Sequence, residues 1–515
     1  MNGAQSLVQT LVNCGVEVCF ANPGTSEMHF VASLDSIAGM RPVLALFEGV
    51  ATGAADGYGR MAGKPAAVLL HLGPGLANGL ANLHNARRAA TPIVNVVGDH
   101  ATYHLQYDAP LTSDIVGFAR PVSSWICESK SARTVAADAA RAVQAACAAP
   151  GGIATLILPA DTAWNEAEHA ASPLPIQGPQ AISDVALSSA AQWLGNGKRT
   201  AILMRGTALL GGGLEAAGRV AAKSGARLLC DTFAPHTELG AGRVYVERLP
   251  YFAEQITAAL ADVEQLILVG AKPPVTFFAY PGKPSWGSPD GCRFLQLAHE
   301  HEDGARALDA LDRALGTASK GPVMRLPLAL PELPQGALNS QTVAQVIANL
   351  TPEHTIFADE SATGSFALFT AMARARPYDH LSLTGGSIGL GLPLALGAAL
   401  ACPDRKVICP HGDGGAAYTM QALWTMAREN LDVTVVIYAN RSYAILNIEL
   451  QRVGAIGAGA KALSMLDLHR PEMNWAQIGQ GLGIESTRAT TCEEFIAQYS
   501  SAMQQRGPRL IEALI

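Results

Sequence analysis

The segment KVICPHGDGG, at positions 406–415, decides the fold class of this chain. It has the pattern of a short apolar strand that ends in a glycine-rich turn. A helix-like stretch, AAYTMQALWTMARENL, follows at 416–431, and a second apolar strand, VTVVIYANRSY, occupies 433–443. A strand, a helix and another strand in this order predict a βαβ unit, in which the two strands lie parallel in one sheet.

Asp413 and Asn440 stand at the ends of these two strands. Because the carboxyl ends of parallel strands meet at one edge of a sheet, both side chains should reach the edge where α/β proteins bind ligands. A carboxylate, an amide oxygen and a nearby backbone carbonyl suit Mg²⁺. Gly412, Gly414 and Gly415 let backbone N–H groups approach phosphate oxygens at a helix N-terminus. A tight turn without a ligand is the competing interpretation, and the turn lacks the GxGxxG pattern of dinucleotide sites.

The rest of the chain repeats this alternation of short apolar runs and helix-like stretches. An α/β fold with parallel sheets flanked by helices is therefore expected throughout. Two segments rich in Pro and Gly, Ala171–Gln180 and Ser319–Asn339, read as linkers. They divide the 515 residues into three expected α/β domains, at 1–170, 181–318 and 340–515, each of ordinary size.

The composition is that of a compact globular enzyme. Hydrophobic residues make up 49% and charged residues 15%, and the net charge is −7 without any block of like charges. We therefore expect no nucleic-acid partner and no membrane partner. No apolar run reaches the roughly 18 to 20 residues of a membrane span, and the start has no basic segment typical of a signal peptide. The nine cysteines form no CxxC pair, which favours reduced thiols and a cytoplasmic location.

GDGG followed by an asparagine at the end of the next strand resembles the thiamine-diphosphate-binding motif of the pyruvate decarboxylase and acetolactate synthase superfamily. The resemblance extends over nearly the whole chain. It implies a pyrimidine-binding, a central and a diphosphate-binding domain, in that order, with thiamine diphosphate and Mg²⁺ as cofactors. The implied metal ligands are Asp413, Asn440 and the backbone carbonyl of Ser442. The cofactor-binding residues implied in this region are Gly412, Asp413, Gly414, Gly415, Asn440, Ser442 and Tyr443.

Glu48 lies in LALFEGVATGAADGYGRMAGKPAAV, at 44–68. Taken alone, a glutamate before a Gly/Ala-rich helix is most simply a favourable charge at the helix N-terminus. The resemblance implies a catalytic role as well, because the segment closely matches the family pattern around the glutamate that contacts N1′ of the aminopyrimidine. A carboxylate there shares a proton with N1′ and favours the 4′-imino form, which removes the proton from thiazolium C2.

Two further segments match loops around the cofactor. In TGGSIGLGLPLALGAALA, at 384–401, the resemblance implies that the Gly386 carbonyl receives the 4′-amino group and that Ile388 is an apolar wedge under the cofactor. A Gly/Ala-rich helix packed on a sheet is the structural alternative. In FADESATGS, at 357–365, Glu360, Ser361 and Thr363 match a loop that helps bind the diphosphate, although the hydroxyl groups would equally serve as an ordinary helix N-cap.

Two residues point to benzoylformate decarboxylase as the family member most similar in pattern. His71 follows the strand AAVLL, where that enzyme has a catalytic histidine, and Thr25 in NPGTSE (22–27) stands near its active-site serine. We therefore expect His71 to relay protons and Thr25 to bind the substrate carboxylate. The segment GAKPPVTFFAYPG (270–282) has Phe277, Phe278 and Ala279 where a second catalytic histidine would stand. That departure leaves the protonation step in doubt.

The expected reaction is therefore the non-oxidative decarboxylation of a small-molecule 2-oxo acid, with carboligation as a further activity. An acetolactate synthase-like carboligase is the alternative, and an inactive cofactor-binding homologue is a third. FAD is not expected, because Arg205 beside Gly206 is the only weak dinucleotide signal in the central part. Family members place the residues that match Glu48 and the Mg²⁺ loop on different subunits, so the resemblance implies a dimer at least, and usually a tetramer.

Overall fold

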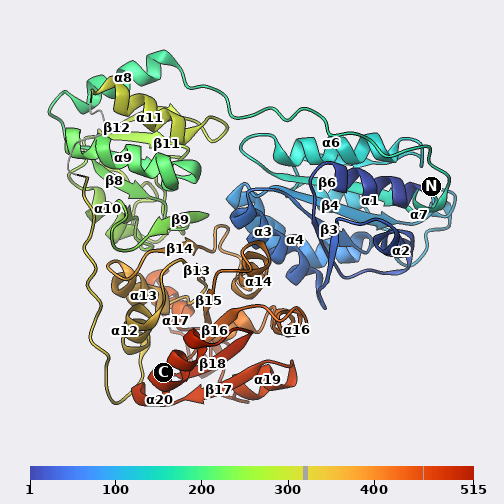
Figure 1. Cartoon of the computed structure of the whole chain (residues 1–515). Helices are drawn as coiled ribbons and strands as arrows, with labels where there is room; N and C mark the ends of the chain where they lie inside the picture. The colour runs from blue at the N-terminus through green and yellow to red at the C-terminus, as the bar shows by residue number, and fades with distance from the viewer. Residues whose placement is uncertain (317–322, 456) are drawn as a thin grey trace.

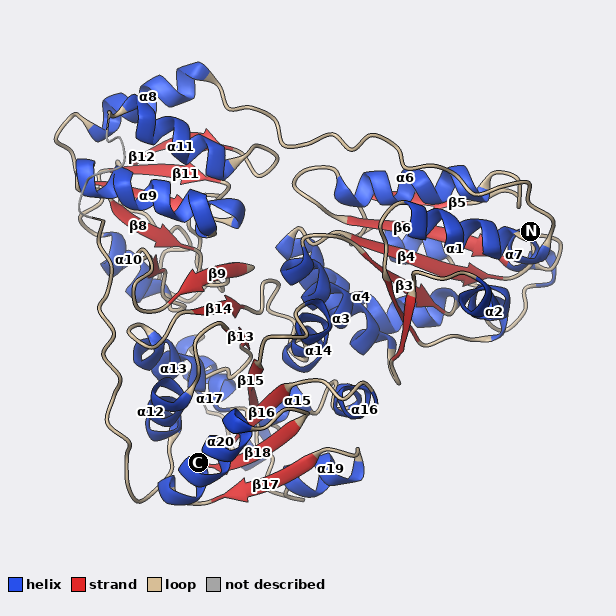
Figure 2. Ribbon diagram, in the orientation of Figure 1, coloured by secondary structure: helices blue, strands red, loops and turns tan. Residues whose placement is uncertain are grey.

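The computed structural model describes residues 1–316, 323–455 and 457–515. Three sheets flanked by helices organise the chain, which confirms the expected α/β fold (Figures 1 and 2). The strands expected in KVICPHGDGG, VTVVIYANRSY and AAVLL form at Val407–Gly412, Val433–Ala439 and Ala66–Leu70. Residues 319–322 of the second expected linker, and residues 317 and 318 at the end of the expected central domain, lie outside the described part of the chain.

The N-terminal sheet has six strands in the order β2-β1-β3-β4-β6-β5, and every neighbouring pair is parallel. Its strands are β1 (Val18–Ala21), β2 (Arg41–Leu44), β3 (Ala66–Leu70), β4 (Ile93–Asp99), β5 (Trp125–Glu128) and β6 (Ile153–Pro159). Its helices are α1 (Gly3–Asn13), α2 (Met28–Ser36), α3 (Glu48–Ala62), α4 (Leu72–Ala89), α5 (Ile115–Ala119), α6 (Val135–Cys147) and α7 (Ala160–Trp164), with the 3-10 helices η1 (Thr25–Glu27) and η2 (Leu105–Tyr107). Helices α1 and α6 pack on one face of the sheet, and α3 and α4 pack on the other.

The central sheet has five parallel strands in the order β10-β8-β7-β11-β12. They are β7 (Thr200–Met204), β8 (Arg227–Cys230), β10 (Glu247–Arg248), β11 (Gln265–Val269) and β12 (Arg293–Ala298). The helices are α8 (Asp184–Leu194), η3 (Gly206–Leu209), α9 (Gly211–Ser224), α10 (Ala253–Leu260) and α11 (Gly304–Ala314). Helices α8, α9 and α11 share one apolar core with the sheet, and α10 packs on the other face.

The C-terminal sheet has seven strands in the order β17-β18-β16-β15-β13-β14-β9. They are β9 (His236–Leu239), β13 (Thr355–Ala358), β14 (Tyr378–Leu381), β15 (Val407–Gly412), β16 (Val433–Ala439), β17 (Glu485–Ala489) and β18 (Arg509–Leu514). The helices are α12 (Ser340–Leu350), α13 (Gly364–Met372), α14 (Gly391–Ala401), α15 (Asp413–Ala416), α16 (Gln421–Arg428), α17 (Ala444–Arg452), α18 (Ala460–Ser464), α19 (Trp475–Gly481) and α20 (Cys492–Gln504). Helices α12, α13 and α20 cover one face, whereas α14 and α16 cover the other.

This third sheet differs from the expected parallel sheet in its edge strand. β9 comes from the central part of the chain and pairs antiparallel with β14. Its sequence, HTEL, has three polar residues before a single leucine, so it contains no apolar run that would mark it as a strand. A side-chain hydrogen bond between His236 Nε2 and Asp379 Oδ1, 2.8 Å long, also links β9 to β14. The central part therefore contributes directly to the C-terminal sheet.

Helices α3 and α14 join the N-terminal and C-terminal sheets into one apolar core (Figure 1). Their backbones lie so close that glycine is required at the contact. A Cβ on Gly57 would lie 2.1 Å from the carbonyl oxygen of Leu394, and a Cβ on Gly397 would lie 1.9 Å from the carbonyl oxygen of Ala54. The Gly/Ala-rich sequences of both helices are thus explained by packing. The expected site residue Glu48 begins α3, and Gly386 and Ile388 lie in the loop before α14.

Candidate active site

The turn after β15 places Asp413 at the carboxyl edge of the C-terminal sheet. Its carboxylate is buried, and it accepts backbone hydrogen bonds from Gly414 to Oδ1 (2.8 Å) and from Arg441 to Oδ2 (2.6 Å). Burial raises the pKa of the Asp413 carboxyl, and the two N–H groups offset part of that rise. A Cβ on Gly414 would lie 2.4 Å from the ring of Tyr443, so the turn requires glycine there. Asp413 is thus a buried carboxyl group whose two oxygens are oriented by backbone N–H groups.

Asn440 follows β16, and its turn brings it to the same edge. Its Oδ1 accepts a hydrogen bond from the Ser442 N–H at 3.0 Å. Arg441, between them, adopts the left-handed conformation with φ +54°, which costs a residue with a side chain on the order of 1 kcal/mol. That conformation turns the Arg441 N–H toward Asp413. The strained residue therefore connects the two strand ends.

A pocket collects most of the residues expected at the diphosphate end of the cofactor. Among the described residues, its lining comes only from the C-terminal part of the chain. The expected residues that line it are Ser361, Thr363, Gly412, Asp413, Gly414, Gly415, Asn440, Ser442 and Tyr443. Carboxylate, amide and carbonyl oxygens together suit Mg²⁺, and the glycine-rich turn at the start of α15 suits phosphate oxygens. The residues present thus fit both a diphosphate and its metal ion.

Glu360 lies beside this pocket but does not line it. Its carboxylate instead accepts three backbone hydrogen bonds, from Gly389 (2.6 Å), Leu390 (2.7 Å) and Gly391 (2.6 Å), at the start of α14. The fully buried His411 places Nε2 3.5 Å from the same carboxylate. Three amides saturate much of the acceptor capacity of a carboxylate, so Glu360 is placed to fix α14 rather than to contact phosphate.

The loop before α14 carries Gly386 and Ile388. Gly386 has φ +73°, and a Cβ there would lie 2.5 Å from the ring of Phe277, so the central part of the chain packs directly on this glycine. The Ile388 side chain is 38% exposed in the single chain, as a wedge that awaits a ligand would be. Phe277 thus packs beside Gly386, in the segment where the resemblance to benzoylformate decarboxylase leads one to expect a histidine.

Glu48 is the first residue of α3 and is half-buried in the single chain. Its Oε2 accepts a hydrogen bond from Asn78 Nδ2 at 3.0 Å. A Cβ on Gly75 would lie 3.4 Å from its Oε1, so α4 packs closely on the carboxylate. Glu48 does not line the pocket that contains Asp413. In the single chain, the two principal candidate residues, Glu48 and Asp413, therefore do not line the same pocket.

His71 belongs to a cluster at the carboxyl ends of β1 and β3. Its Nδ1 lies 2.8 Å from Oε2 of Glu27, a fully buried carboxylate, and 3.3 Å from Oγ of Ser26. A Cβ on Gly98 would lie 1.6 Å from Glu27 Oε1, so that glycine makes room for the carboxylate. The expected residue Thr25 is exposed, and Ser26 is the hydroxyl that faces His71. Sequence reasoning missed Glu27, because nothing local marks a glutamate after a turn as buried.

Three of the left-handed non-glycine residues lie on the loops just described. Leu72 (φ +50°) follows His71, Ala362 (φ +51°) separates Ser361 from Thr363, and Arg441 follows Asn440. Such conformations persist only where the surrounding structure holds them, and they are frequent at ligand sites. Their positions mark the same three loops that the motifs single out.

The central part borders a cavity of about 990 Å³ at the carboxyl ends of its strands. Arg205 and Gly206 both line it, but the Arg205 guanidinium is bound to Asp231 Oδ2 at 2.5 Å and to the backbone carbonyl of Arg88 at 2.6 Å. That arginine is therefore already bound by groups of the protein itself.

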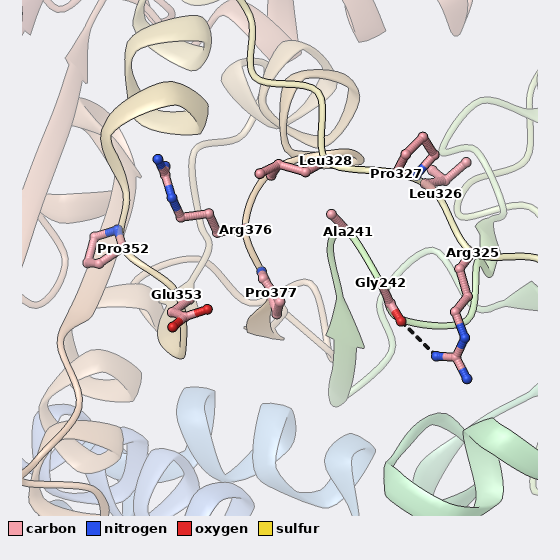
Figure 3. Close-up of a pocket in the computed structure, with 10 residues that line it drawn as sticks. All are labelled: Ala241, Gly242, Arg325, Leu326, Pro327, Leu328, Pro352, Glu353, Arg376 and Pro377. Atoms are coloured by element: carbon pink, nitrogen blue, oxygen red, sulfur yellow. Dashed lines mark hydrogen bonds between the residues drawn. The ribbon is translucent and has the colours of Figure 1, made fainter.

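A second cavity has a volume of about 790 Å³. It lies between 241–242, 325–328, 352–353 and 376–377 and contains none of the expected site residues (Figure 3).

Comparison with known proteins decides the family. Residues 1–117 match the "Thiamine pyrophosphate enzyme, N-terminal TPP binding domain", and residues 362–513 match the corresponding C-terminal TPP binding domain. A Mycobacterium tuberculosis protein named "Putative acetolactate synthase large subunit IlvX" is 53% identical over 100% of this chain and 99% of its own length. This chain belongs to the thiamine pyrophosphate enzymes. Thiamine pyrophosphate is the same compound as thiamine diphosphate, so the resemblance found in the sequence is confirmed.

More distant relatives of this thiamine pyrophosphate enzyme cover its full length too. Benzoylformate decarboxylase of Pseudomonas aeruginosa is 29% identical over 97% of this chain and 96% of its own. The solved 4-hydroxybenzoylformate decarboxylase of Rhodococcus jostii RHA1 superposes with a TM-score of 0.86 at 22% identity, over 100% of this chain and 99% of its own, which establishes a shared fold. None of the helices in the described part of the chain is long and apolar enough to span a lipid bilayer.

Proposed function

We propose that this enzyme uses thiamine diphosphate and Mg²⁺ to decarboxylate a 2-oxo acid without oxidation, in the manner of benzoylformate decarboxylase. The observation that carries the proposal is the contact of His71 with the buried Glu27 and with Ser26. A carboxylate on one ring nitrogen fixes the orientation of an imidazole and leaves the other nitrogen to exchange protons. The name of the Pseudomonas relative and its full-length match support the same activity.

Each part of the site then has a defined task. The carboxylate of Asp413, the amide oxygen of Asn440 and the backbone carbonyl of Ser442 would hold Mg²⁺, and the turn at Gly414 and Gly415 would hold the diphosphate. When bound, the cofactor supplies the carbon nucleophile that adds to the 2-oxo group and accepts the electron pair released with CO₂. Glu48 would hold a proton at the pyrimidine, and His71 would move a proton to or from the substrate.

A carboligase of the acetolactate synthase type is the second candidate. It is favoured by the name of the 53% identical relative and by Phe277 and Phe278 in the place of a catalytic histidine. Phenyl rings cannot deliver a proton, so Phe277 and Phe278 would favour coupling to an aldehyde or a second 2-oxo acid over release of a protonated aldehyde. Both candidates share every cofactor contact and differ only in the product released.

The deciding experiment supplies purified protein with thiamine diphosphate, Mg²⁺ and one 2-oxo acid at a time. Pyruvate, branched-chain 2-oxo acids, phenylpyruvate and benzoylformate form the panel, and CO₂ and organic products are both quantified. One aldehyde for each CO₂ identifies a decarboxylase and its preferred side chain. Hydroxyketone or acetohydroxy acid in place of aldehyde assigns the chain to the carboligases. No CO₂ from any member of the panel, in the presence of bound cofactor, would contradict both.

Glu48→Gln tests the assignment of the proton-holding carboxylate. We expect turnover to fall by on the order of 100-fold or more, because an amide cannot share a proton with N1′. Affinity for thiamine diphosphate with Mg²⁺ should change little, because the pocket of Asp413 does not include Glu48. Turnover and a fluorescence titration of cofactor measure the two effects. Glu17→Gln, at an exposed ion pair with Lys64, is the control. A Glu48→Gln enzyme as fast as wild type would remove Glu48 from the mechanism.

A further inference from the structure

Asn85, on α4 of the N-terminal part, reaches across to the loop before α14. It is fully buried. Its Oδ1 accepts the N–H groups of Gly385 (3.1 Å) and Ser387 (3.2 Å), and its Nδ2 donates to the Ser387 carbonyl (2.8 Å) and to Asn82 Oδ1 (3.0 Å). A carboxamide has two donors and two acceptor sites. All four are used here, and three of them bind the loop.

Asn85 forms hydrogen bonds with the residues directly before and after Gly386, which are Gly385 and Ser387. Neighbouring contacts strengthen the hold, since Thr384 Oγ1 donates to the Asn85 carbonyl at 2.7 Å and His84 Nε2 lies 3.1 Å from the Gly385 carbonyl. On its other side Gly386 meets the Phe277 ring. The N-terminal and central parts of the chain thus converge on one glycine of the C-terminal part, whose conformation would otherwise be the least restricted of any residue.

We propose that Asn85 is a positioning residue that fixes the direction of the Gly386 carbonyl toward the aminopyrimidine of the cofactor. The proposal rests on the proposed function, because it requires that the loop of Gly386 binds thiamine diphosphate. Asn85 itself touches neither cofactor nor substrate. It acts by holding the peptide groups at 385 and 387, so that the carbonyl between them cannot rotate away from the 4′-amino group.

Asn85→Asp is the sharpest variant. It keeps the shape of the side chain and the acceptors for Gly385 and Ser387, but it replaces the donor to the Ser387 carbonyl with an oxygen that repels it. Asn85→Ala removes all four bonds. The matched control is Asn95→Ala on β4, which removes an equally buried asparagine of the N-terminal part whose Nδ2 donates to Thr155 Oγ1 at 3.1 Å.

The readout is the rate at which the C2 proton of bound thiamine diphosphate exchanges with D₂O, measured by quenched-flow NMR, beside cofactor affinity and thermal unfolding. A small misplacement of a reacting group costs on the order of 100-fold in rate, and we expect that slowing in both Asn85 variants. Cofactor affinity should stay within about threefold, because the metal and diphosphate ligands lie in another pocket. Asn95→Ala should exchange at the wild-type rate.

Two results would overturn the proposal. One is wild-type exchange in a folded Asn85 variant that binds cofactor. The other is failure of both Asn85 variants to fold while Asn95→Ala folds, since Asn85 would then be general support. Failure of the proposed function can be told apart from failure of the Asn85 proposal, because exchange of the C2 proton requires bound thiamine diphosphate but no 2-oxo acid. Wild-type protein that exchanges C2 but releases no CO₂ from any 2-oxo acid would refute the decarboxylation alone.

Discussion

Two neighbouring hydroxyl groups, Thr25 and Ser26, differ sharply in their surroundings. Ser26 Oγ donates to Glu27 Oε1 at 2.7 Å and lies 3.3 Å from His71 Nδ1, whereas the Thr25 residue is exposed. We expect Ser26→Ala to lower kcat/KM by on the order of 10- to 100-fold, because it disturbs the orientation of the imidazole. Thr25→Ala should stay within about threefold. Steady-state kinetics on the best substrate of the panel measure both.

Each of the two alanine variants is the control for the other, because both remove one hydroxyl group from the same 3-10 helix. Equal losses in the two variants would contradict the geometry, and a larger loss in Thr25→Ala would restore the residue that the sequence suggested. A shift in the pH profile of kcat/KM in Ser26→Ala alone would connect the loss to His71 rather than to folding.

Single residues show which parts of the site the sequence could predict. Asp413 and Asn440 were predictable because each ends an apolar strand, and the parallel βαβ order brings such ends together. Glu27 and Asn85 were not, because their partners lie far away in the chain. The Glu27 carboxylate contacts His71, and the Asn85 carboxamide bonds residues about 300 positions later in the chain. A local pattern contains no record of such contacts.

At the scale of elements, β9 is the clearest departure from expectation. The apolar runs at Ala66–Leu70 and Val433–Ala439 could be read as strands because buried parallel strands are apolar along their whole length. β9 is a short edge strand with three polar residues out of four, and it pairs antiparallel with β14. Hydrophobic pattern alone does not reveal such a strand.

The buried carboxyl group of Asp379 predicts a pH dependence of stability. Burial opposes ionisation of Asp379, but His236 and Arg405 outweigh it and lower its pKa to about 2. A carboxyl with a lowered native pKa adds stability above its ordinary value near 4, and the addition is lost as pH falls from about 4 toward 2. Asp379→Asn should therefore cost about 2 kcal/mol of unfolding free energy at pH 7.

Urea unfolding at pH 7, 5, 4 and 3 measures this difference between variant and wild type. The gap should narrow as the pH falls from about 4 to 3. The control Asp262→Asn removes a carboxylate that is mostly exposed, 3.3 Å from Arg227, and should change stability by only a few tenths of a kcal/mol at every pH. A gap that widened toward acid would reverse the sign assigned to Asp379.

At the scale of the whole molecule, the α3–α14 contact builds one core from two sheets but leaves the candidate site divided. Glu48 stands at the start of α3, whereas every described residue that lines the pocket of Asp413 lies at position 361 or later. The exposed Ile388 side chain and the half-buried Glu48 carboxylate are both groups that a complete site would cover. We infer that a second copy of the chain completes each site, so that Glu48 of one subunit serves the Asp413 pocket of the other.

Subunit complementation tests this inference. Glu48→Gln and Asp413→Ala should each be nearly inactive alone. When the two variants are coexpressed, half of randomly formed dimers contain one chain of each kind, and each mixed dimer has one site with both residues intact. About a quarter of all sites, and of wild-type activity, should return. Coexpression of Asp413→Ala with Asn440→Ala should restore no activity. Both residues line the same pocket of one chain, so every pocket in a mixed dimer lacks one of them. If Glu48 and Asp413 of one chain formed the site together, the first mixture would stay inactive as well, because a mixed dimer would then combine two defective sites.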